Sequence, residues 1–383
     1  MTIGIDARLW DQGGVGRYIR NLVLNLVQID EKNEYVLFVR SEDERDVRNQ
    51  ISELKIENLK LKIVHANISW HSFSEQLNFP RIIAKEKVDL MHFPYFNVPI
   101  FYKKPYIITI HDLIYHHFVS GQASTLPLWL YGFKMLSYRY TIKTALNRAK
   151  KIIAVSQFTK RDILNTLGVK TEKIEVIYEA ADDFSARGGS SFGRKLESDK
   201  LDFGNYFLYV GNIYPHKNAE LLIKAFRILS KEDSKLRLVF VGKEDYFYAK
   251  LKKQLKGFEK NGSVIFLNNV SDQKLASLYR SAICLVRPSL MEGFSLPPIE
   301  AAANGCLVLA SDIPVHREVF GDSIVYFDQY SLDDILSKMK KIMSLSEKDK
   351  KSLIEKQLNK IQSYSWNSTA QQTLKVYESS LGL

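Results

Sequence analysis

Residues 287–305 read RPSLMEGFSLPPIEAAANG, and this stretch decides the fold of the second half of the chain. The apolar run Ala282–Val286 that leads into it predicts a buried strand. Pro297 and Pro298 suit the first turn of a helix, where a missing N–H costs nothing, and Gly305 suits its C-terminal cap. The stretch therefore predicts a strand, a tight loop and the N-terminus of a helix.

The loop between this strand and helix predicts an anion site. A helix N-terminus carries a partial positive charge and free backbone N–H groups, and we expect those of the loop to face a ligand. Glu292 and Glu300 bracket the loop, and either glutamate alone is equally explained by its favourable interaction with the helix dipole. Together they suit a ligand with both phosphates and hydroxyls, such as a nucleotide sugar. The four loop residues are Gly293, Phe294, Ser295 and Leu296.

Short apolar runs alternate with amphipathic stretches along the whole chain, which is typical of parallel βα units. We expect an α/β protein with domains at 1–180 and 205–363, a linker at 181–204 and a last helix within 364–383. Strands are expected at Ile3–Ile5, Tyr35–Val39, Leu61–Val64, Val88–Phe93, Tyr106–Ile110, Lys151–Val155 and Glu175–Tyr178. In the second half they are expected at Tyr206–Val210, Leu238–Val241, Val264–Leu267, Ala282–Val286, Cys306–Ala310 and Ser323–Phe327.

Composition limits the class of protein. The chain has 383 residues, of which 45% are hydrophobic, so it can build two cores. Its net charge of +11 favours an acidic partner, which could be phosphates, an anionic membrane surface or nucleic acid. No apolar run is long enough to span a membrane, and the N-terminus does not resemble a signal peptide. We therefore expect a cytoplasmic protein.

A second strand, glycine loop and helix N-terminus occur at the start of the chain. The loop, Gln12–Arg17, contains Gly13 and Gly14, and glycines let the backbone approach a phosphate closely. A nicotinamide dinucleotide site is the alternative interpretation. That site requires Asp or Glu at the end of the next strand, but the strand ends in Arg40, so this alternative weakens.

Two histidines follow strands, where open parallel sheets bind ligands. His111 comes directly after Tyr106–Ile110 and stands beside Asp112. A structural histidine, hydrogen-bonded in a loop, is the plain alternative for His111. His92 lies at an analogous position, with Tyr95 and Phe96 behind it, and we interpret these three as acceptor contacts.

In the second half, Lys217 lies near the N-terminus of an expected helix. A lysine there opposes the helix dipole unless an anion neutralises both, so its position predicts a bound phosphate.

Further on, Ser271 or Asp272 suits the cap of another helix. A carboxylate at Asp272 could also accept from the two N–H donors of guanine, a pair that uracil does not offer.

The segment EGFSLPPIE closely resembles the E-x7-E motif of family 4 retaining glycosyltransferases. The resemblance implies the GT-B fold: two Rossmann-like parallel-sheet domains facing a central cleft, with the C-terminal helix crossing back to the N-terminal domain. By motif, Glu292 would lie by the transferred sugar and Glu300 would hold the ribose. The resemblance extends to TIHD, which would place His111 near the sugar and its β-phosphate.

The same resemblance assigns donor contacts elsewhere. The glycine loop would touch the diphosphate through Gly13, Gly14 and Arg17, and the turn at Val270 and Asp272 would meet the base. Lys217 matches a diphosphate-binding lysine of the family. Asn212 stands where the family usually has arginine, a departure that His216 or Arg287 could compensate.

The motifs EQLNFP, HFPYF and TIHDL look most like bacterial mannosyltransferases that build cell-surface polysaccharide. The expected reaction moves a hexose, mannose from GDP-mannose, to a glycan or lipid-linked oligosaccharide with retention. A UDP-sugar or other donor is the alternative, and a non-catalytic sugar- or nucleotide-binding protein is the alternative of a different class. No metal or cofactor and no nucleic-acid partner are expected.

Residues 126–151 are aromatic and basic, with Trp129, Phe133 and Leu136 beside Arg139 and Lys143. An amphipathic helix of this kind can lie on the inner face of a membrane. An ordinary helix that packs its apolar side on the sheet explains the same pattern.

Overall fold

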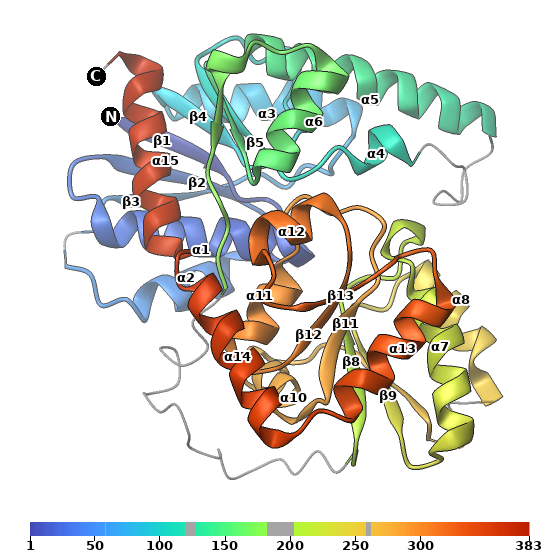
Figure 1. Cartoon of the computed structure of the whole chain (residues 1–383). Coiled ribbons are helices and arrows are strands. Elements are labelled where there is room, and N and C mark those ends of the chain that lie inside the picture. Colours follow the sequence, from blue (N-terminus) through green and yellow to red (C-terminus); the bar gives the residue numbers. More distant parts are fainter. Residues whose placement is uncertain (58, 119–127, 182–202, 258–261, 383) are drawn as a thin grey trace. The chain divides into compact units, whose positions relative to one another are not determined.

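The computed structural model of the chain describes residues 1–57, 59–118, 128–181, 203–257 and 262–382 (Figure 1). The chain divides into two compact units. Unit 1 comprises Met1–Ala180 and Tyr364–Leu383, and unit 2 comprises Ala181–Ser363. Most of the expected linker, residues 182–202, lies outside the described residues.

Unit 1 is built on a parallel sheet of seven strands in the order β3-β2-β1-β4-β5-β6-β7. Its strands are β1 Thr2–Asp6, β2 Glu34–Val39, β3 Leu61–His65, β4 Leu90–Phe93, β5 Tyr106–Ile110, β6 Lys151–Ala154 and β7 Ile174–Val176. Its helices are α1 Gly13–Ile29, α2 Glu44–Ser52, α3 Phe73–Lys85, α4 Ile114–His117, α5 Leu128–Arg148, α6 Gln157–Leu167, the 3-10 turn η2 Thr171–Lys173 and α15 Trp366–Leu381.

Unit 2 repeats this architecture with six parallel strands in the order β10-β9-β8-β11-β12-β13. Its strands are β8 Tyr206–Val210, β9 Arg237–Val241, β10 Val264–Leu267, β11 Cys284–Arg287, β12 Val308–Ser311 and β13 Val325–Phe327. Its helices are η4 Pro215–Lys217, α7 Ala219–Glu232, α8 Tyr246–Gln254, α10 Asp272–Ser281, α11 Leu296–Ala303, α12 Pro314–Phe320, α13 Leu332–Met343 and α14 Glu347–Ile361.

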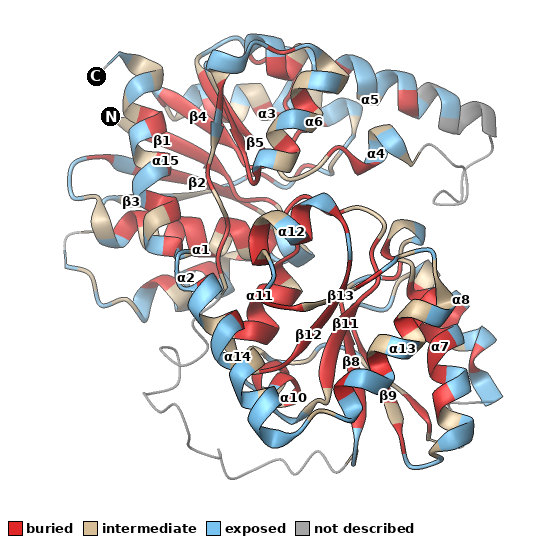
Figure 2. Ribbon diagram, in the orientation of Figure 1, coloured by how far each residue is buried: buried red, intermediate tan, exposed pale blue. Residues whose placement is uncertain are grey.

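Each sheet is the centre of a separate core. Figure 2 shows that buried residues cover most of the strands, while the helices alternate buried and exposed faces. The near-continuous apolar runs of the sequence match the central strands, such as β4 and β8, which are buried on both faces. In unit 2 the core includes Cys284, and both cysteines are free thiols and buried, as their apolar surroundings predict.

The last helix, α15, belongs to unit 1, although the rest of the second half of the chain forms unit 2. Ser365 caps it by accepting from the N–H of Ser368 at 3.1 Å. The Tyr377 hydroxyl lies 2.8 Å from Nδ1 of His92 on β4, and the Trp366 ring packs near Tyr18 on α1. The predicted return of the C-terminal helix to the first domain is therefore confirmed.

Candidate active site

The strand order of each sheet reverses at one place, between β1 and β4 in unit 1 and between β8 and β11 in unit 2. Open parallel sheets bind ligands outside the carboxyl ends of the strands at such a switch point. In unit 2, the loop that carries Lys217 follows β8 and the loop that carries Glu292 follows β11. Lys217 and the EGFSLPPIE segment therefore meet at the edge where a ligand is expected.

The carboxylate of Glu292 is the centre of a buried charge cluster at this edge. Its Oε2 accepts from Nζ of Lys217 at 2.7 Å. Its Oε1 accepts from Nε of Arg287 at 2.9 Å and from Oγ of Ser289 at 2.6 Å, and Arg287 Nη2 lies 2.7 Å from the same oxygen. All four residues are buried, so the cluster is shielded from water.

The cluster has one more cation than anion. Burial by itself raises the pKa of Glu292, but the charges of Arg287 and Lys217 outweigh burial and hold that pKa well below the ordinary range. Glu292 is therefore ionised, and together with the two cations it leaves a net charge of +1 at the ends of β8 and β11. Buried charges are costly unless they are paired, so this surplus favours a bound anion.

Gly211 makes room for Arg287. It adopts a positive φ of 129°, and a Cβ built on it would lie 2.9 Å from Nη1 of Arg287. That nitrogen donates to the carbonyl of Val210 at 2.8 Å. Because an L side chain fits here neither in conformation nor in space, the glycine after β8 is what lets the guanidinium reach Glu292.

Of the two residues that could compensate the departure at Asn212, Arg287 and His216, the structure makes only Arg287 a buried cation. Asn212 is exposed, and its carbonyl accepts from the Tyr209 hydroxyl at 2.6 Å. Burial, together with the charge of Lys217, lowers the pKa of His216 to about 3, so this ring is neutral. Of the two substitutes that the sequence offered, only Arg287 carries charge at the site.

The loop of residues 293–296 leads into α11 as predicted. Ser295 is the N-cap, with a left-handed φ of 76°, and its buried Oγ has no hydrogen-bond partner in the described part of the chain. Left-handed backbone in a residue other than glycine is strained, and such strain concentrates at functional sites. Pro297 and Pro298 lie in the first turn, so they withdraw two of the four N–H groups that a helix N-terminus normally offers.

The other end of α11 is closed by Gly305, as expected. Its φ is 71°, its N–H donates to Ala302, and the N–H of Cys306 donates to Ala301. This is the Schellman arrangement of a helix C-terminus. Glu300 lies within α11 and is buried, and its Oε2 accepts from the hydroxyl of Tyr279 at 3.1 Å.

The turn after β10 caps α10 through Ser271, whose Oγ accepts from the N–H of Lys274 at 3.3 Å. The sequence left Ser271 and Asp272 as alternatives for this role. Asp272 is instead the first residue of α10 and is half-buried, and Val270 precedes the cap. The Asp272 carboxylate is therefore not the cap.

In unit 1, the glycine loop opens α1. Gly13 and Gly14 are exposed in its first turn, Gly13 has a left-handed φ of 51°, and Arg17 is half-buried one turn on. No side chain caps α1, and its first turn contains no acidic residue. Both features are those of a helix N-terminus that can accept an anion.

Both ring nitrogens of His111 are engaged inside unit 1. Nδ1 lies 2.8 Å from Oε1 of Glu179, and Nε2 lies 3.0 Å from the carbonyl of Pro94. Burial by itself lowers the pKa of His111, but the hydrogen bond and charge of Glu179 outweigh burial and raise it. Since both acceptors are oxygens, the imidazolium form satisfies both contacts. With both nitrogens engaged inside unit 1, the ring is not placed to take a proton from a ligand.

His92 does not lie where an acceptor contact requires it. It is fully buried, with Nδ1 2.8 Å from the Tyr377 hydroxyl and Nε2 2.8 Å from Thr109 Oγ1. The expectation for His92 is corrected: the ring joins β4, β5 and α15 in the core. Tyr95 is half-buried, and Phe96, whose ring centroid lies 4.1 Å from that of Tyr95, is mostly buried.

Three further residues belong to the surroundings of the cluster and were not singled out from the sequence. Oγ of Ser289 donates a hydrogen bond to Glu292, and the backbone carbonyl of Ser289 accepts from Oγ of Ser311 at 2.6 Å. His316 is fully buried, and its Nδ1 donates to the carbonyl of Ser311 at 2.8 Å. Nothing in the local sequence marks these residues, because their role depends on the neighbouring strands β11 and β12.

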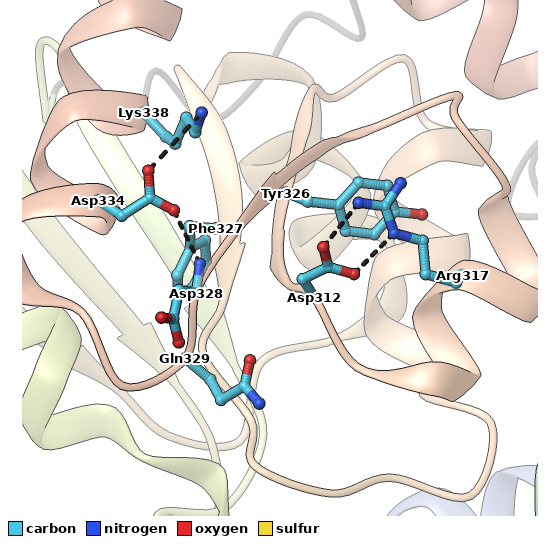
Figure 3. A pocket seen from close by; sticks show the side chains of 8 residues that line it. All are labelled: Asp312, Arg317, Tyr326, Phe327, Asp328, Gln329, Asp334 and Lys338. Atoms are coloured by element: carbon cyan, nitrogen blue, oxygen red, sulfur yellow. Dashed lines mark hydrogen bonds and ion pairs between the residues drawn. The ribbon is translucent and has the colours of Figure 1, made fainter.

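A cavity of about 480 Å³ lies at the carboxyl ends of β12 and β13 (Figure 3). Arg317 donates to both oxygens of Asp312, at 2.6 and 2.7 Å, and its guanidinium lies 3.8 Å from the centroid of Tyr326. Lys338 pairs with Asp334 at 3.6 Å. The lining also includes Asp328, so its carboxylates outnumber its cations and the cavity suits a diphosphate less well than the Glu292 cluster does.

Within the described ranges, no group of three or more His, Cys, Asp or Glu side chains is placed to hold a metal ion. The same ranges contain no helix long and apolar enough to cross a membrane.

Comparison with protein families assigns each half of the chain. The family described as "Glycosyltransferase Family 4" matches residues 12–183, and the family described as "Glycosyl transferases group 1" matches residues 195–359. Both families are glycosyltransferases, and each matches one half of the chain, so the chain is a glycosyltransferase. The chain belongs to family 4 of the glycosyltransferases.

Relatives with assigned names are similar over part of the chain. The O-antigen chain mannosyltransferase RfbU of Salmonella typhimurium is 32% identical over 67% of this chain, and the match covers 65% of that protein. O-antigen chain mannosyltransferase B of Escherichia coli is 27% identical over 62% of this chain and 63% of its own length. The matches thus span slightly less than two thirds of both relatives.

Solved structures share the fold at low identity. HepE of Anabaena, in complex with UDP and glucose, aligns with a TM-score of 0.71 and 16% identity over 99% of this chain and all of that chain. WaaG, a glycosyltransferase involved in lipopolysaccharide biosynthesis, aligns with a TM-score of 0.73 and 12% identity over 98% of this chain and 99% of its own. The expected GT-B architecture is therefore confirmed.

Proposed function

We propose that the protein is a retaining glycosyltransferase that moves mannose from GDP-mannose to a glycan or lipid-linked oligosaccharide in cell-surface polysaccharide synthesis. The observation that carries the proposal is the buried cluster of Lys217, Arg287 and Glu292 with its surplus positive charge. The named relatives, which are O-antigen mannosyltransferases, support mannose as the sugar.

The charge cluster suits the leaving group of this reaction. When the glycosidic bond to the diphosphate breaks, negative charge develops on the phosphate oxygen. Preorganised cations in a site shielded from water stabilise such charge more than the same groups would in water. Lys217 and Arg287 are held in place by Glu292 before any ligand binds, so little reorganisation accompanies the reaction.

Glu292 is unsuited to act as the general base. Its carboxylate already accepts from two cations and a hydroxyl, and its pKa is held well below the ordinary range, so it binds protons weakly. His111 is also unsuited, because both of its ring nitrogens are occupied. We propose that the leaving phosphate takes the proton of the acceptor hydroxyl on the same face of the sugar, which gives retention.

The base of the donor is assigned to guanine through Asp272. Because Ser271 caps α10, the carboxylate of Asp272 is not needed for that purpose. A carboxylate can accept from both N–H donors on one edge of guanine, and hydrogen bonds to charged groups are stronger than neutral ones. The UDP in the HepE structure belongs to that protein, and a UDP-sugar remains the alternative donor here.

We further propose that the protein rests on the inner face of an anionic membrane through unit 1. Residues 90–161 contain ten lysines and arginines but a single acidic residue, Asp112. On α5, Leu136 and Tyr140 are 67% and 62% exposed, and Lys143 continues their face of the helix. Ile142 and Leu146 of the same helix pack in the core, so both interpretations of the sequence apply to it. Leu126 and the side chains of Trp129 and Phe133 lie outside what is described.

The test of the proposed activity is a panel of nucleotide sugars, screened first for thermal stabilisation and then for release of nucleotide with and without a mannosylated acceptor. We expect stabilisation by GDP-mannose and acceptor-dependent release of GDP. Stabilisation without release of any nucleotide would favour a non-catalytic binding protein. Sedimentation with vesicles of phosphatidylglycerol, compared with vesicles of phosphatidylcholine, tests the membrane contact separately.

A further inference from the structure

A second cavity, of about 540 Å³, lies in unit 1 at the carboxyl ends of β2 and β3. Residues 40–42 form one wall and residues 67–70 the other. The parallel register, in which Val39 faces His65, brings the two loops out side by side. The volume lies within the range of about 300–1,000 Å³ that is common for small-molecule sites. No residue assigned above to the donor site lines this cavity.

The two walls are held together before any ligand binds. The N–H of Ser41 donates to Oδ1 of Asn67, and Nδ2 of Asn67 donates to Oγ of Ser41, both at 2.8 Å. Hydrogen bonds in both directions fix the distance between the loops. A site whose walls are fixed in advance loses less conformational entropy when it binds.

Trp70 is the aromatic member of the lining, and its ring is held from behind. The guanidinium of Arg8 lies 5.0 Å from the ring centroid, and the ring of Tyr95 lies 5.7 Å away. Arg8 is itself fixed by Asp6 and by Glu75, each at 2.7 Å. The indole N–H is buried and has no partner in the described part of the chain. The structure thus presents an indole ring that is fixed from behind and lines the cavity.

The charges of the lining cancel. Arg40 forms an ion pair with Glu42, and the other polar groups are the hydroxyls of Ser41 and Ser69 and the amide of Asn67. A wall without net charge has no preference for a phosphate, in contrast to the Glu292 cluster. An aromatic ring beside hydroxyl, amide and paired charged groups matches a neutral sugar, which has apolar C–H faces and hydroxyl edges.

Aromatic rings connect the cavity to the end of β4. From Trp70 the series passes to Tyr95, then to Phe96 at 4.1 Å and to Tyr115 at 6.1 Å. Tyr95 and Phe96 were expected to contact the acceptor. Phe96 is mostly buried, but Tyr95 is half-buried, so an acceptor chain that contacts Tyr95 at the end of β4 would lie beside Trp70 and the cavity.

We propose that the cavity formed by residues 40–42 and 67–70 is an accessory subsite that binds neutral sugar residues of the acceptor chain, remote from the reacting hydroxyl. Only the identification of the ligand as the acceptor rests on the proposed function. The subsite makes a longer acceptor bind more tightly without changing the chemical step.

The test is saturation-transfer NMR and titration with α-linked manno-oligosaccharides, from the monosaccharide to the hexasaccharide, on the full chain. Trp70→Ala removes the ring. Ser69→Tyr fills the cavity while leaving Trp70 and its packing intact, which keeps the test valid if Trp70→Ala unfolds. Phe73→Ala is the matched control, because Phe73 is 78% exposed, lies nearby in the sequence and does not line the cavity.

We expect the affinity of the wild type and of Phe73→Ala to rise with oligosaccharide length. Trp70→Ala and Ser69→Tyr should weaken hexasaccharide binding by at least about fivefold, the scale of losing a well-packed aromatic contact. Equal hexasaccharide affinity in the wild type and in a folded Ser69→Tyr, or no oligosaccharide binding by the wild type, would overturn the proposal.

Turnover of nucleotide sugars separates this inference from the proposed function. If Trp70-dependent oligosaccharide binding is found but no nucleotide sugar is turned over, the subsite stands and the proposed activity fails. If GDP-mannose is turned over with a KM for the acceptor that does not depend on its length or on Trp70, the activity stands and the subsite fails.

Discussion

Nζ of Lys217 lies 2.7 Å from Oε2 of Glu292, although 75 positions of sequence separate the two residues. The sequence marked each of them separately, Lys217 as a cation that needs an anion and Glu292 as a carboxylate near a sugar. In the structure, each is the partner of the other. The lysine is therefore already compensated in part, and it is Arg287 that brings the surplus positive charge.

Glu292→Gln should destabilise unit 2 because it leaves Lys217 and Arg287 buried without a counter-charge. Breaking a buried ion pair in this way typically costs about 3–5 kcal/mol. Denaturant unfolding of the variant at neutral pH measures the loss. Ser289→Ala, which removes only the hydroxyl bond to the Glu292 carboxylate, is the control and should cost less, about 1.5–3 kcal/mol.

The difference in unfolding free energy between the wild type and Glu292→Gln should depend on pH in the acid range, in a known direction. The pKa of Glu292 is lower in the folded than in the unfolded protein, so its contribution is fully present above the unfolded value of about 4.3 and is lost as the pH falls below it. The stability difference between wild type and Glu292→Gln should therefore shrink below about pH 4. A difference that stays constant down to pH 3 would contradict the ion pair.

Ser295→Gly should separate stability from activity. Glycine relieves the left-handed backbone at φ 76°, which is strained for serine, and the gain should be at most about 1 kcal/mol because glycine also loses more entropy on folding. Loss of the buried Oγ should lower kcat/KM by about tenfold or more if it donates to a charged phosphate. Ser295→Ala is the control: it should lose the same activity and gain no stability. Full activity in both variants would rule out a ligand contact by Oγ.

The contact between His111 and Glu179 should make the stability of the protein fall as the pH rises above neutral. Because the pKa of His111 is raised in the folded state, the stability it contributes is fully present below about pH 6.5 and is lost as the pH rises through the folded pKa. Thermal unfolding between pH 6 and 9 should show this decline in the wild type and a weaker one in Glu179→Gln. Asp162→Asn, which removes the partner of the exposed His117, should leave the decline in place.

Asp272→Asn tests the base of the donor. The change keeps the size of the side chain but removes the negative charge and replaces one acceptor oxygen with an NH2 donor, and Ser271 still caps α10. GDP binding should weaken at least about tenfold, because hydrogen bonds to a charged group are worth roughly 1.5–3 kcal/mol each. UDP binding should hardly change. Calorimetric titration of both nucleotides measures this, and equal affinity of the wild type for GDP and UDP would overturn the assignment to GDP-mannose.

The fold could be predicted from the sequence because the central strands of both sheets are buried on both faces. Such strands appear as short apolar runs between turn residues, and every expected strand is found with its ends shifted by two residues or fewer. The helix caps could also be predicted: Gly305 closes the C-terminus of α11, and Ser271 caps the N-terminus of α10. Local conformation at these positions depends on residues that are adjacent in sequence.

The site could be predicted only in part, because its pairings join different strands. The sequence pointed to Lys217 and Glu292 through their positions at strand ends, but not to their contact with each other. It could not distinguish Arg287 from His216, since the choice depends on burial and on the room that Gly211 leaves. The interpretation of His92 as an acceptor contact failed for the same reason. His92 lies at the end of a strand, where site residues are expected, but Tyr377 of α15 covers it.

The most direct test of the central claim is the rate of mannose transfer from GDP-mannose by Lys217→Met, compared with the wild type under conditions in which both are folded. Methionine keeps the length and apolar stem of the side chain and removes the cation that is proposed to contact the leaving diphosphate. Losing one preorganised contact of this kind typically costs about 3–4 kcal/mol of transition-state stabilisation. We expect kcat to fall by about 10²–10³. A folded variant that transfers mannose at the wild-type rate would contradict it.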